Sequence, residues 1–302
     1  MKIPYIDKNF RESSLQIIAQ ADDICEEYAG QGFDLTLRQL YYQFVARDLL
    51  DNTQRNYKKL GKIISDARLA GMLDWDHLVD RTRSLRGIND SISPAAALRR
   101  LRHGYHLERW DNQDTRLEVW VEKEALIGVF ARICNRYNVD FFACKGYVSQ
   151  SEMWRAAQRH IGYETDGQEV VVVHFGDHDP SGVDMTRDIQ DRLYTFGAGT
   201  TVDRVALTME QVNEHQPPPN PTKFTDSRAS DYIAQYGYES WELDALNPDT
   251  LSELVEDEVN EYRDMDKWAE VDEQERNDKK VFAWLSDKSS LQLHEMRIND
   301  AS

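Results

Sequence analysis

The chain has 302 residues, of which 40% are hydrophobic and 30% are charged, a composition typical of a soluble protein with a sizeable core and more than one domain. No apolar run approaches the roughly 20 residues that cross a bilayer, which predicts no membrane association and a cytoplasmic location. The three cysteines, Cys25, Cys134 and Cys144, form no CxxC pair. This pattern indicates inert thiols, and neither a zinc site nor a disulfide framework.

The formal net charge of −18 argues against a protein that coats nucleic acids without specificity. The charge is unevenly distributed, however. Residues 55–109 hold twelve Lys and Arg against six Asp and Glu, whereas residues 226–302 hold eight against twenty-one. We therefore expect the N-terminal third to contact phosphates, and the acidic C-terminal part to face solvent or a basic partner.

Residues 1–110 are interpreted as a helical DNA-binding domain. An apolar stripe at 15–24 predicts a first helix, and Thr36 is placed to cap a second one. A third helix is expected at 53–70, with apolar residues inward and basic residues outward. Residues 78–85 could then form a small hairpin. Three helices followed by such a wing make a winged-helix pattern, in which a basic helix enters a DNA groove.

Strands and helices alternate in residues 111–215, which predicts an α/β layer with a mostly parallel, Rossmann-like sheet. The strands are expected at 117–121, 139–143, 170–175 and 202–207. In such sheets, ligands bind at the carboxyl ends of the strands.

Residues 216–302 are interpreted as a Pro-rich linker followed by an acidic helical extension. The prolines of 216–221 predict a stiff linker that separates the sheet from this extension. Thr250 and Glu253 match a capping box that would open a helix with an apolar face. Residues after 264 carry many charges and few apolar side chains, so we expect this end to be partly mobile.

Carboxylates follow two of the expected strands. Asp177 and Asp179 come after the strand at 170–175, and alternation along an extended backbone would point both the same way. Glu122 follows the strand at 117–121. These three acids predict an open magnesium site suited to phosphodiester chemistry. The alternatives are turn residues before Pro180 for the two aspartates, and a strand-end charge paired with Lys123 for Glu122.

Four motifs follow one another along the chain: LRQLYY at 37–42, VEKEAL at 121–126, KGY at 145–147 and GDHDPSG at 176–182. The last three resemble the signatures of the Toprim domain. The version they resemble is that of the topoisomerase VI A subunit (type IIB) and its relative, the meiotic double-strand-break transesterase. The first motif resembles that family's Arg-x-x-Tyr-Tyr helix, and SWELDAL at 240–246 is similar to an acidic segment after its Toprim core. Four motifs in order are more specific than any one alone.

The resemblance implies that Tyr42 is the DNA-cleaving nucleophile of a winged-helix domain, and that Glu122, Asp177 and Asp179 hold Mg²⁺. Arg38 lies four residues before Tyr42 on the same helical face, where its charge would favour the ionised phenol. In the family, the tyrosine of one protomer of a homodimer meets the metal of the other, and the phosphotyrosyl link conserves the bond energy. No segment here resembles the family's ATPase, so an ATPase partner would have to be encoded separately.

Basic residues near this nucleophile are expected either to contact DNA or to form a solvated face. They are Arg55, Lys58, Lys59, Lys62, Arg81, Arg83 and Arg86. Lys123 is expected either to contact DNA at a phosphate or to support the metal ligands. Tyr41 is interpreted as a packing residue. His178 is interpreted as a wall residue or a phosphate contact. Glu242 and Asp244 could supply a second metal or lie in an exposed turn.

The leading hypothesis is a magnesium-dependent tyrosine transesterase that cleaves double-stranded DNA as a homodimer. The alternative is a Toprim nuclease that hydrolyses DNA through metal-activated water, with Tyr42 only structural. A third possibility is a DNA-binding module without turnover. The three intact acids, Glu122, Asp177 and Asp179, argue against that last possibility.

Overall fold

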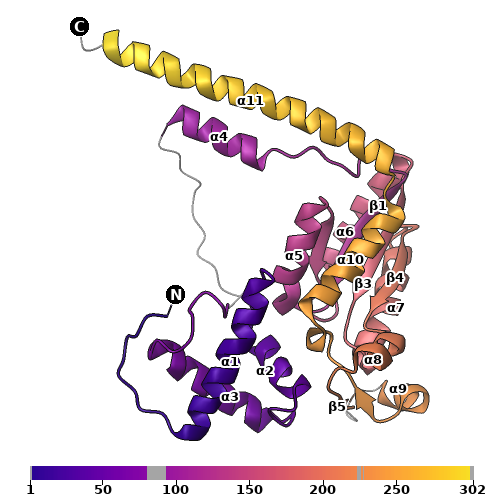
Figure 1. The fold of residues 1–302 in the computed structure, drawn as a ribbon. Coiled ribbons are helices and arrows are strands. Elements are labelled where there is room, and N and C mark those ends of the chain that lie inside the picture. Colours follow the sequence, from indigo (N-terminus) through magenta and orange to yellow (C-terminus); the bar gives the residue numbers. More distant parts are fainter. Residues whose placement is uncertain (1, 80–92, 223–225, 227, 300–302) are drawn as a thin grey trace.

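The computed structural model describes residues 2–79, 93–222, 226 and 228–299. The chain is mixed α/β, mostly helical, with a four-stranded parallel sheet (Figure 1). An N-terminal group of helices lies at one end of this sheet domain, and a long C-terminal helix extends from its other end.

The N-terminal group consists of α1 (Glu12–Gly30), α2 (Leu37–Ala46) and α3 (Gln54–Leu69), which pack on one another. Helix α2 begins with a capping box in which Thr36 and Gln39 bond each other's backbone N–H, and Thr53 caps α3. Their apolar faces are buried against α1. The three expected helices are confirmed.

The expected wing is only partly described. Leu78 forms an isolated parallel bridge with Leu35, and the Val79 N–H donates to the Leu35 carbonyl oxygen at 3.0 Å. The rest of the hairpin lies outside the described residues, as do Arg81, Arg83 and Arg86. The winged-helix assignment stays a prediction.

The sheet contains β1 (Thr115–Val121), β2 (Asp140–Ala143), β3 (Glu169–Phe175) and β4 (Thr201–Ala206), in the order β2-β1-β3-β4. All pairs are parallel, which confirms the four expected strands and is compatible with a Rossmann-like domain. Strands β1 and β3 are almost wholly buried, as their apolar runs require. Val121 is in register with Phe175, so the carboxyl ends of these two strands lie side by side.

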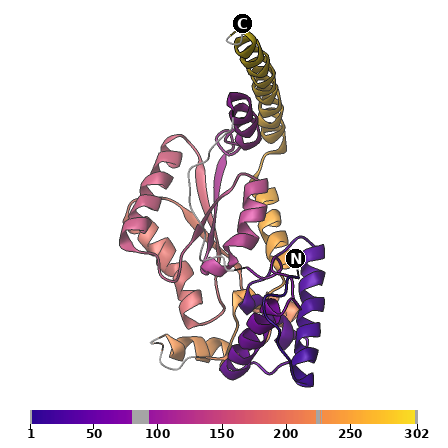
Figure 2. The same cartoon turned by 90° about the vertical axis from the view of Figure 1, so that its left-hand side faces the viewer.

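Helices cover both faces of the sheet (Figure 2). Helices α5 (Ile127–Arg136) and α10 (Pro248–Tyr262) lie on one face, and α6 (Gln150–Thr165) and α7 (Pro180–Thr195) on the other. The short 3₁₀ helices η1 (Glu124–Leu126) and η2 (Leu243–Ala245) lie close to the strand ends. The three cysteines are buried and free, as expected.

The expectation of a separating linker at 216–221 is wrong. After α8 (Met209–His215), Pro217 and Pro218 are buried, and β5 (Asn220–Pro221) pairs antiparallel with β6 (Glu239–Ser240). Helix α9 (Ala229–Tyr236) lies between these two strands in sequence. The segment therefore folds back onto the sheet domain.

The acidic extension is helical, as expected, but part of it belongs to the sheet domain. Helix α10 begins at Pro248 with Asn247 as its cap, so the capping box at Thr250 is wrong. Leu251, Val255 and Val259 of α10 are buried in the main core, which makes this helix a layer of the sheet domain. The end expected to be partly mobile forms α11 (Met265–Asn299).

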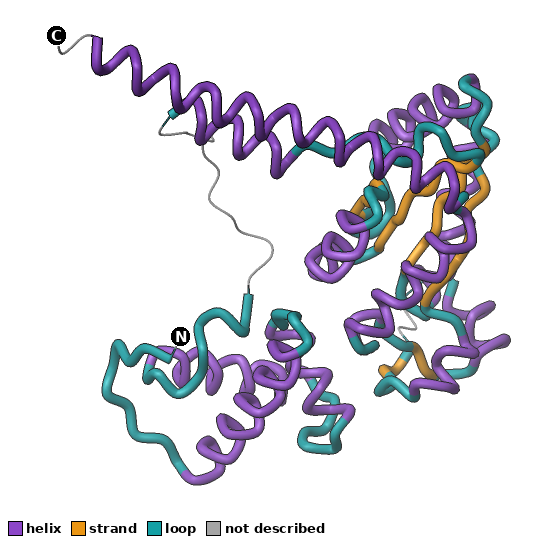
Figure 3. The backbone as a smooth tube through the Cα atoms, turned by 45° about the horizontal axis from the view of Figure 1, so that its top comes forward, coloured by secondary structure: helices purple, strands orange, loops and turns teal. Residues whose placement is uncertain are grey.

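Helix α4 (Pro94–Gly104) lies along α11 (Figures 1 and 3), although its residues fall in the segment assigned to the N-terminal domain. Ser286 donates to the Ala95 carbonyl oxygen, and the rings of Tyr105 and Phe282 lie 5.1 Å apart. None of the described helices has the length and apolar character needed to cross a membrane.

Candidate functional site

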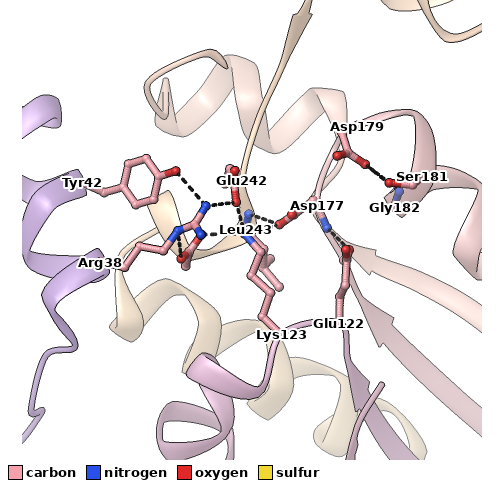
Figure 4. A network of polar contacts seen from close by, with 12 residues as sticks. Arg38, Tyr42, Glu122, Lys123, Asp177, Asp179, Ser181, Gly182, Glu242 and Leu243 are labelled. Atoms are coloured by element: carbon pink, nitrogen blue, oxygen red, sulfur yellow. Dashed lines mark hydrogen bonds and ion pairs between the residues drawn. The ribbon is translucent and has the colours of Figure 1, made fainter. Parts of the chain in front are cut away.

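The carboxyl ends of β1 and β3 bring Glu122 and Asp177 together (Figure 4). The Asp177 N–H donates to Glu122 Oε2 at 2.8 Å. Asp179 instead caps α7, because its Oδ1 accepts the Gly182 N–H at 2.7 Å. A Cβ at Gly182 would lie 2.2 Å from the Asp177 carbonyl oxygen, so glycine permits this close approach. The two aspartates therefore have different roles: Asp177 lies against Glu122 at the strand ends, whereas Asp179 caps a helix.

His178 connects this strand end to the C-terminal segment. Its backbone exchanges two hydrogen bonds with Trp241, at 2.8 and 2.9 Å. Its ring packs against Tyr232 and Trp241, and burial lowers the pKa of His178 to about 4, so the ring is neutral at pH 7. The structure therefore gives His178 a packing role, and the bridge sets the residues after Trp241 against Asp177.

Three carboxylates, those of Asp177, Glu242 and Asp244, form what we call the acidic cluster. One oxygen from each lies within 4.8 Å of the others. Asp177 is 6% exposed and Asp244 is 2% exposed, so the exposed-turn alternative is wrong for Asp244. The Leu243 N–H also donates to Asp177 Oδ1 at 2.8 Å, which ties η2 to the strand end.

The acidic cluster could hold a metal ion, because carboxylate oxygens are the ligands that hard divalent cations prefer. Asp244 Oδ2 is buried and accepts no hydrogen bond from the described part of the chain, although Arg38 Nε lies 3.1 Å away. This oxygen is thus an acceptor suited to a cation. Glu122 and Asp179, which were predicted as ligands, lie outside the group.

Two side chains neutralise the acidic cluster in this structure. Lys123 Nζ lies 2.9 Å from Asp177 Oδ1 and 2.8 Å from Asp244 Oδ1, and it also contacts Glu242. Arg38 Nη2 donates to Glu242 Oε2 at 2.7 Å. Lys123 was predicted to contact DNA, but here it lies among the acids with its side chain 18% exposed.

Burial and charge shift the pKa values of these groups in opposite directions. Burial raises the pKa of Asp177 to about 8, although the Lys123 ammonium opposes that shift. Burial also raises the pKa of Glu122. For Lys123, burial alone would lower the pKa, but Asp244, Asp177 and Glu242 outweigh it and raise that pKa. The cation stays charged, and the contact between Lys123 and Asp177 acts on both groups, since it contributes to the stabilised ammonium and opposes the rise in the Asp177 pKa.

Tyr42 lies beside this cluster, 4% exposed, on α2. Its Oη is 3.4 Å from Arg38 Nη2, the same nitrogen that binds Glu242 (Figure 4). Burial, together with Asp244 and Glu242, raises the pKa of Tyr42, and Arg38 opposes this shift without outweighing it. Arg38 thus favours the ionised phenol, as expected, but burial and the two acids outweigh its effect and keep the phenol neutral. The hydroxyl lies beside the acids of its own chain.

The neighbouring residues fall into two groups. Tyr41 is a packing residue, as predicted, since it is 4% exposed and its Oη accepts the Thr53 N–H at 2.7 Å. The four basic residues expected on α3 are exposed and form no ion pair with any residue that the structure describes. They are Arg55, Lys58, Lys59 and Lys62.

Sequence reasoning missed Arg204 on β4. Its guanidinium donates to the carbonyl oxygens of Asp177 at 2.6 Å, Gly182 at 2.8 Å and Gly176 at 3.1 Å. These bonds fix the backbone from which Asp177 projects. The only signal in the sequence is one arginine, next to Asp203, in a short expected strand.

No family model matches the chain, and no curated protein matches its sequence. The functional proposal therefore rests on the geometry of the site and on the resemblance of its motifs.

Proposed function

We propose that this chain is a DNA-cleaving tyrosine transesterase related to the topoisomerase VI A subunit, with Tyr42 as its nucleophile. The observation that best supports it is the contact from Tyr42 through Arg38 to Glu242 and Asp244. A tyrosine and an acidic cluster from segments about 200 residues apart meet at one place, as phosphoryl transfer requires.

In the proposed reaction, Tyr42 Oη forms a bond to a backbone phosphorus while the bond from that phosphorus to one deoxyribose oxygen breaks. The phenol gives up its proton, and the leaving deoxyribose oxygen gains one. The number of phosphate ester bonds is unchanged, so resealing is the reverse reaction and needs no energy source. Arg38 would contact the phosphate once it releases Glu242.

Magnesium is the proposed cofactor, held by Asp177, Glu242 and Asp244. When bound, the ion would offset charge that develops on the phosphate. Glu122 would position Asp177 through its bond to the Asp177 N–H, and Asp179 would hold the start of α7. Lys123 would then be free to turn from the acids toward DNA.

The test is to incubate the protein with supercoiled plasmid and Mg²⁺, then denature with and without protease. We expect a covalent protein–DNA adduct that protease digests. Tyr42→Phe should abolish it, and Asp177→Asn should reduce it about 100-fold or more. Tyr194→Phe is the matched control, because Tyr194 is a 77% exposed residue of α7 and its hydroxyl bonds none of the described residues.

The second candidate is a nuclease that uses metal-activated water. The burial and raised pKa of Tyr42 favour it, since a neutral buried phenol is a weak nucleophile. Free DNA ends without adduct, retained in Tyr42→Phe, would support this candidate and contradict the transesterase.

The resemblance further suggests a homodimer. In that arrangement Tyr42 of one protomer would leave the acids of its own chain and act at the acidic cluster of its partner. Light scattering on the purified protein tests the dimer. Mixing Tyr42→Phe with Asp177→Asn tests the exchange, because only active sites assembled across the dimer would recover cleavage. The same resemblance allows a separately encoded ATPase partner, and strand passage that appears only with an added ATPase would support one.

A further inference from the structure

A pocket of about 330 Å³ opens beside Tyr42. Its wall comes from α2, from the start of α3 and from the pairing of β5 with β6. Asn52 joins the two sides, since its Nδ2 donates to Asn220 Oδ1 at 2.7 Å and to the Pro219 carbonyl oxygen at 3.1 Å. The volume is near the low end of the range for ligand pockets.

One side of the pocket is aromatic. Tyr41, Tyr42 and Tyr57 all line it, and the rings of Tyr41 and Tyr57 meet edge to face at 5.3 Å. The hydroxyl of Tyr41 is committed to Thr53, so this ring is held in place. Tyr41 and Tyr42 are each 4% exposed, so the ring of half-buried Tyr57 offers the surface on which a nucleobase can stack, whichever base it is.

Uncommitted amides line the same pocket. Within the described ranges, neither the Gln54 side chain nor Asn220 Nδ2 has a hydrogen-bond partner. An amide offers a donor and an acceptor in one plane, which suits the edge of a base. Asn52, by contrast, already uses its amide to hold Asn220.

Arg38 and Glu242 line the pocket as well, so it adjoins the acidic cluster. A phosphate at the cluster would therefore place its attached nucleoside at the pocket mouth. We propose that this pocket binds one unpaired nucleoside of the DNA strand, next to the phosphate that Tyr42 attacks. The inference rests on the proposed function and adds that the enzyme must take one base out of the stack.

The test uses short single-stranded oligonucleotides with one abasic site moved along the sequence. They are bound to Tyr42→Phe without Mg²⁺, so that neither the tyrosine nor metal-activated water cleaves the strand. One abasic position should weaken binding about 5- to 100-fold, the range expected for one stacked base. Adding Tyr57→Leu should weaken binding of the intact oligonucleotide by the same factor. The loss of affinity from the abasic site and the loss from Tyr57→Leu should not add. Adding Gln54→Ala should also weaken it.

One variant serves as a control. Gln274→Ala removes an exposed amide on α11, far from the pocket in sequence, and should bind normally. Gln54 is itself exposed, so its substitution tests the pocket even if Tyr57→Leu unfolds the protein.

The outcomes separate this inference from the proposed function. If the protein forms an adduct with plasmid DNA but no abasic position weakens binding, the nucleoside pocket is contradicted and the transesterase proposal is not. If one abasic position weakens binding, its loss does not add to that of Tyr57→Leu, and no adduct forms, the nucleoside pocket is supported and the transesterase proposal is contradicted. Equal abasic effects in the parent and in Tyr57→Leu would also overturn the pocket.

Discussion

Lys123 occupies the position that a cation must take among the carboxylates of the acidic cluster. Its ammonium contacts Asp177, Asp244 and Glu242 together, in surroundings where unpaired charges are costly. A metal ion and Lys123 would thus compete for the same oxygens. In the proposed mechanism, an ion that binds the acidic cluster would therefore have to displace this lysine.

Lys123→Met tests this competition. Removing one partner of a buried ion pair costs about 3–5 kcal/mol, so we expect the variant to lose about 3 kcal/mol of unfolding free energy without metal. Added Mg²⁺ should then stabilise the variant more than the wild type, because no ammonium has to leave. Urea unfolding with and without Mg²⁺ measures both effects.

Lys58→Met is the matched control, since Lys58 is exposed and has no ion pair with the described residues. It should change stability by less than about 0.5 kcal/mol. If Lys123→Met were as stable as the wild type, or if Mg²⁺ stabilised both equally, the competition would be contradicted.

At the scale of elements, α10 carries a carboxylate whose proton affinity depends on neighbouring acids. Burial, with Glu261, Asp203 and Asp257 nearby, raises the pKa of Glu258 to about 7. The unfolded pKa is about 4.3, so the folded state binds this proton more tightly. Stability contributed by Glu258 is therefore present below about pH 4.3 and lost as the pH rises to about 7.

Glu258→Gln should consequently be more stable than the wild type at pH 8, by about 1–2 kcal/mol once solvent screening is included. The difference should shrink toward zero near pH 4.5, where Glu258 is protonated. Chemical unfolding at the two pH values measures it. Glu253→Gln, at an exposed position of the same helix, should show no such pH-dependent gain.

Helix α4 depends on α11 for its position. The Tyr105–Phe282 ring contact and the bond from Arg109 Nε to Asp272 at 2.8 Å hold the segment there. Phe282→Ala should remove about 1–2 kcal/mol of this packing and speed amide exchange in α4 about 10-fold. Trp284→Ala, at a 58% exposed residue of α11, should leave that exchange unchanged. Hydrogen–deuterium exchange by mass spectrometry distinguishes the two.

The elements that were predictable are those with local causes. Thr36 and Thr53 cap helices by accepting backbone N–H groups three residues further along the chain. The apolar run that ends at Phe175 has the composition of a strand buried on both faces, whatever its position in the sheet. Glu122 and Asp177 could be placed together because parallel strands end at one edge. The α4–α11 pairing joins segments about 190 residues apart, and no local pattern indicates it.

The ligand set was harder to predict because its residues come from segments that are far apart in the sequence. Glu242 and Asp244 reach Asp177 only because Trp241 bridges the backbone of His178. Alternation along a strand suggested that Asp179 would join Asp177, but the chain turns into α7 there and uses Asp179 as its cap. A helix cap within the motif thus overrode the extended geometry on which that expectation depended.

For the whole molecule, the question is how a chain with a net charge of −18 could bind DNA. Arg55, Lys58, Lys59 and Lys62 place four exposed cations on α3, the helix next to the one that carries Tyr42. Binding confined to such a patch should depend steeply on salt, because each neutralised phosphate releases counterions.

The double variant Lys58→Gln/Lys62→Gln should therefore weaken DNA binding to the same extent for every DNA sequence. It should also lower the slope of log K against log salt by about 1 for each phosphate contact removed. Fluorescence anisotropy of a labelled duplex at several salt concentrations gives both quantities. Lys280→Gln with Lys288→Gln removes the same charge from exposed positions of α11 and should leave the slope unchanged. Equal slopes for the two double variants would mean that net charge, and not the α3 surface, governs binding.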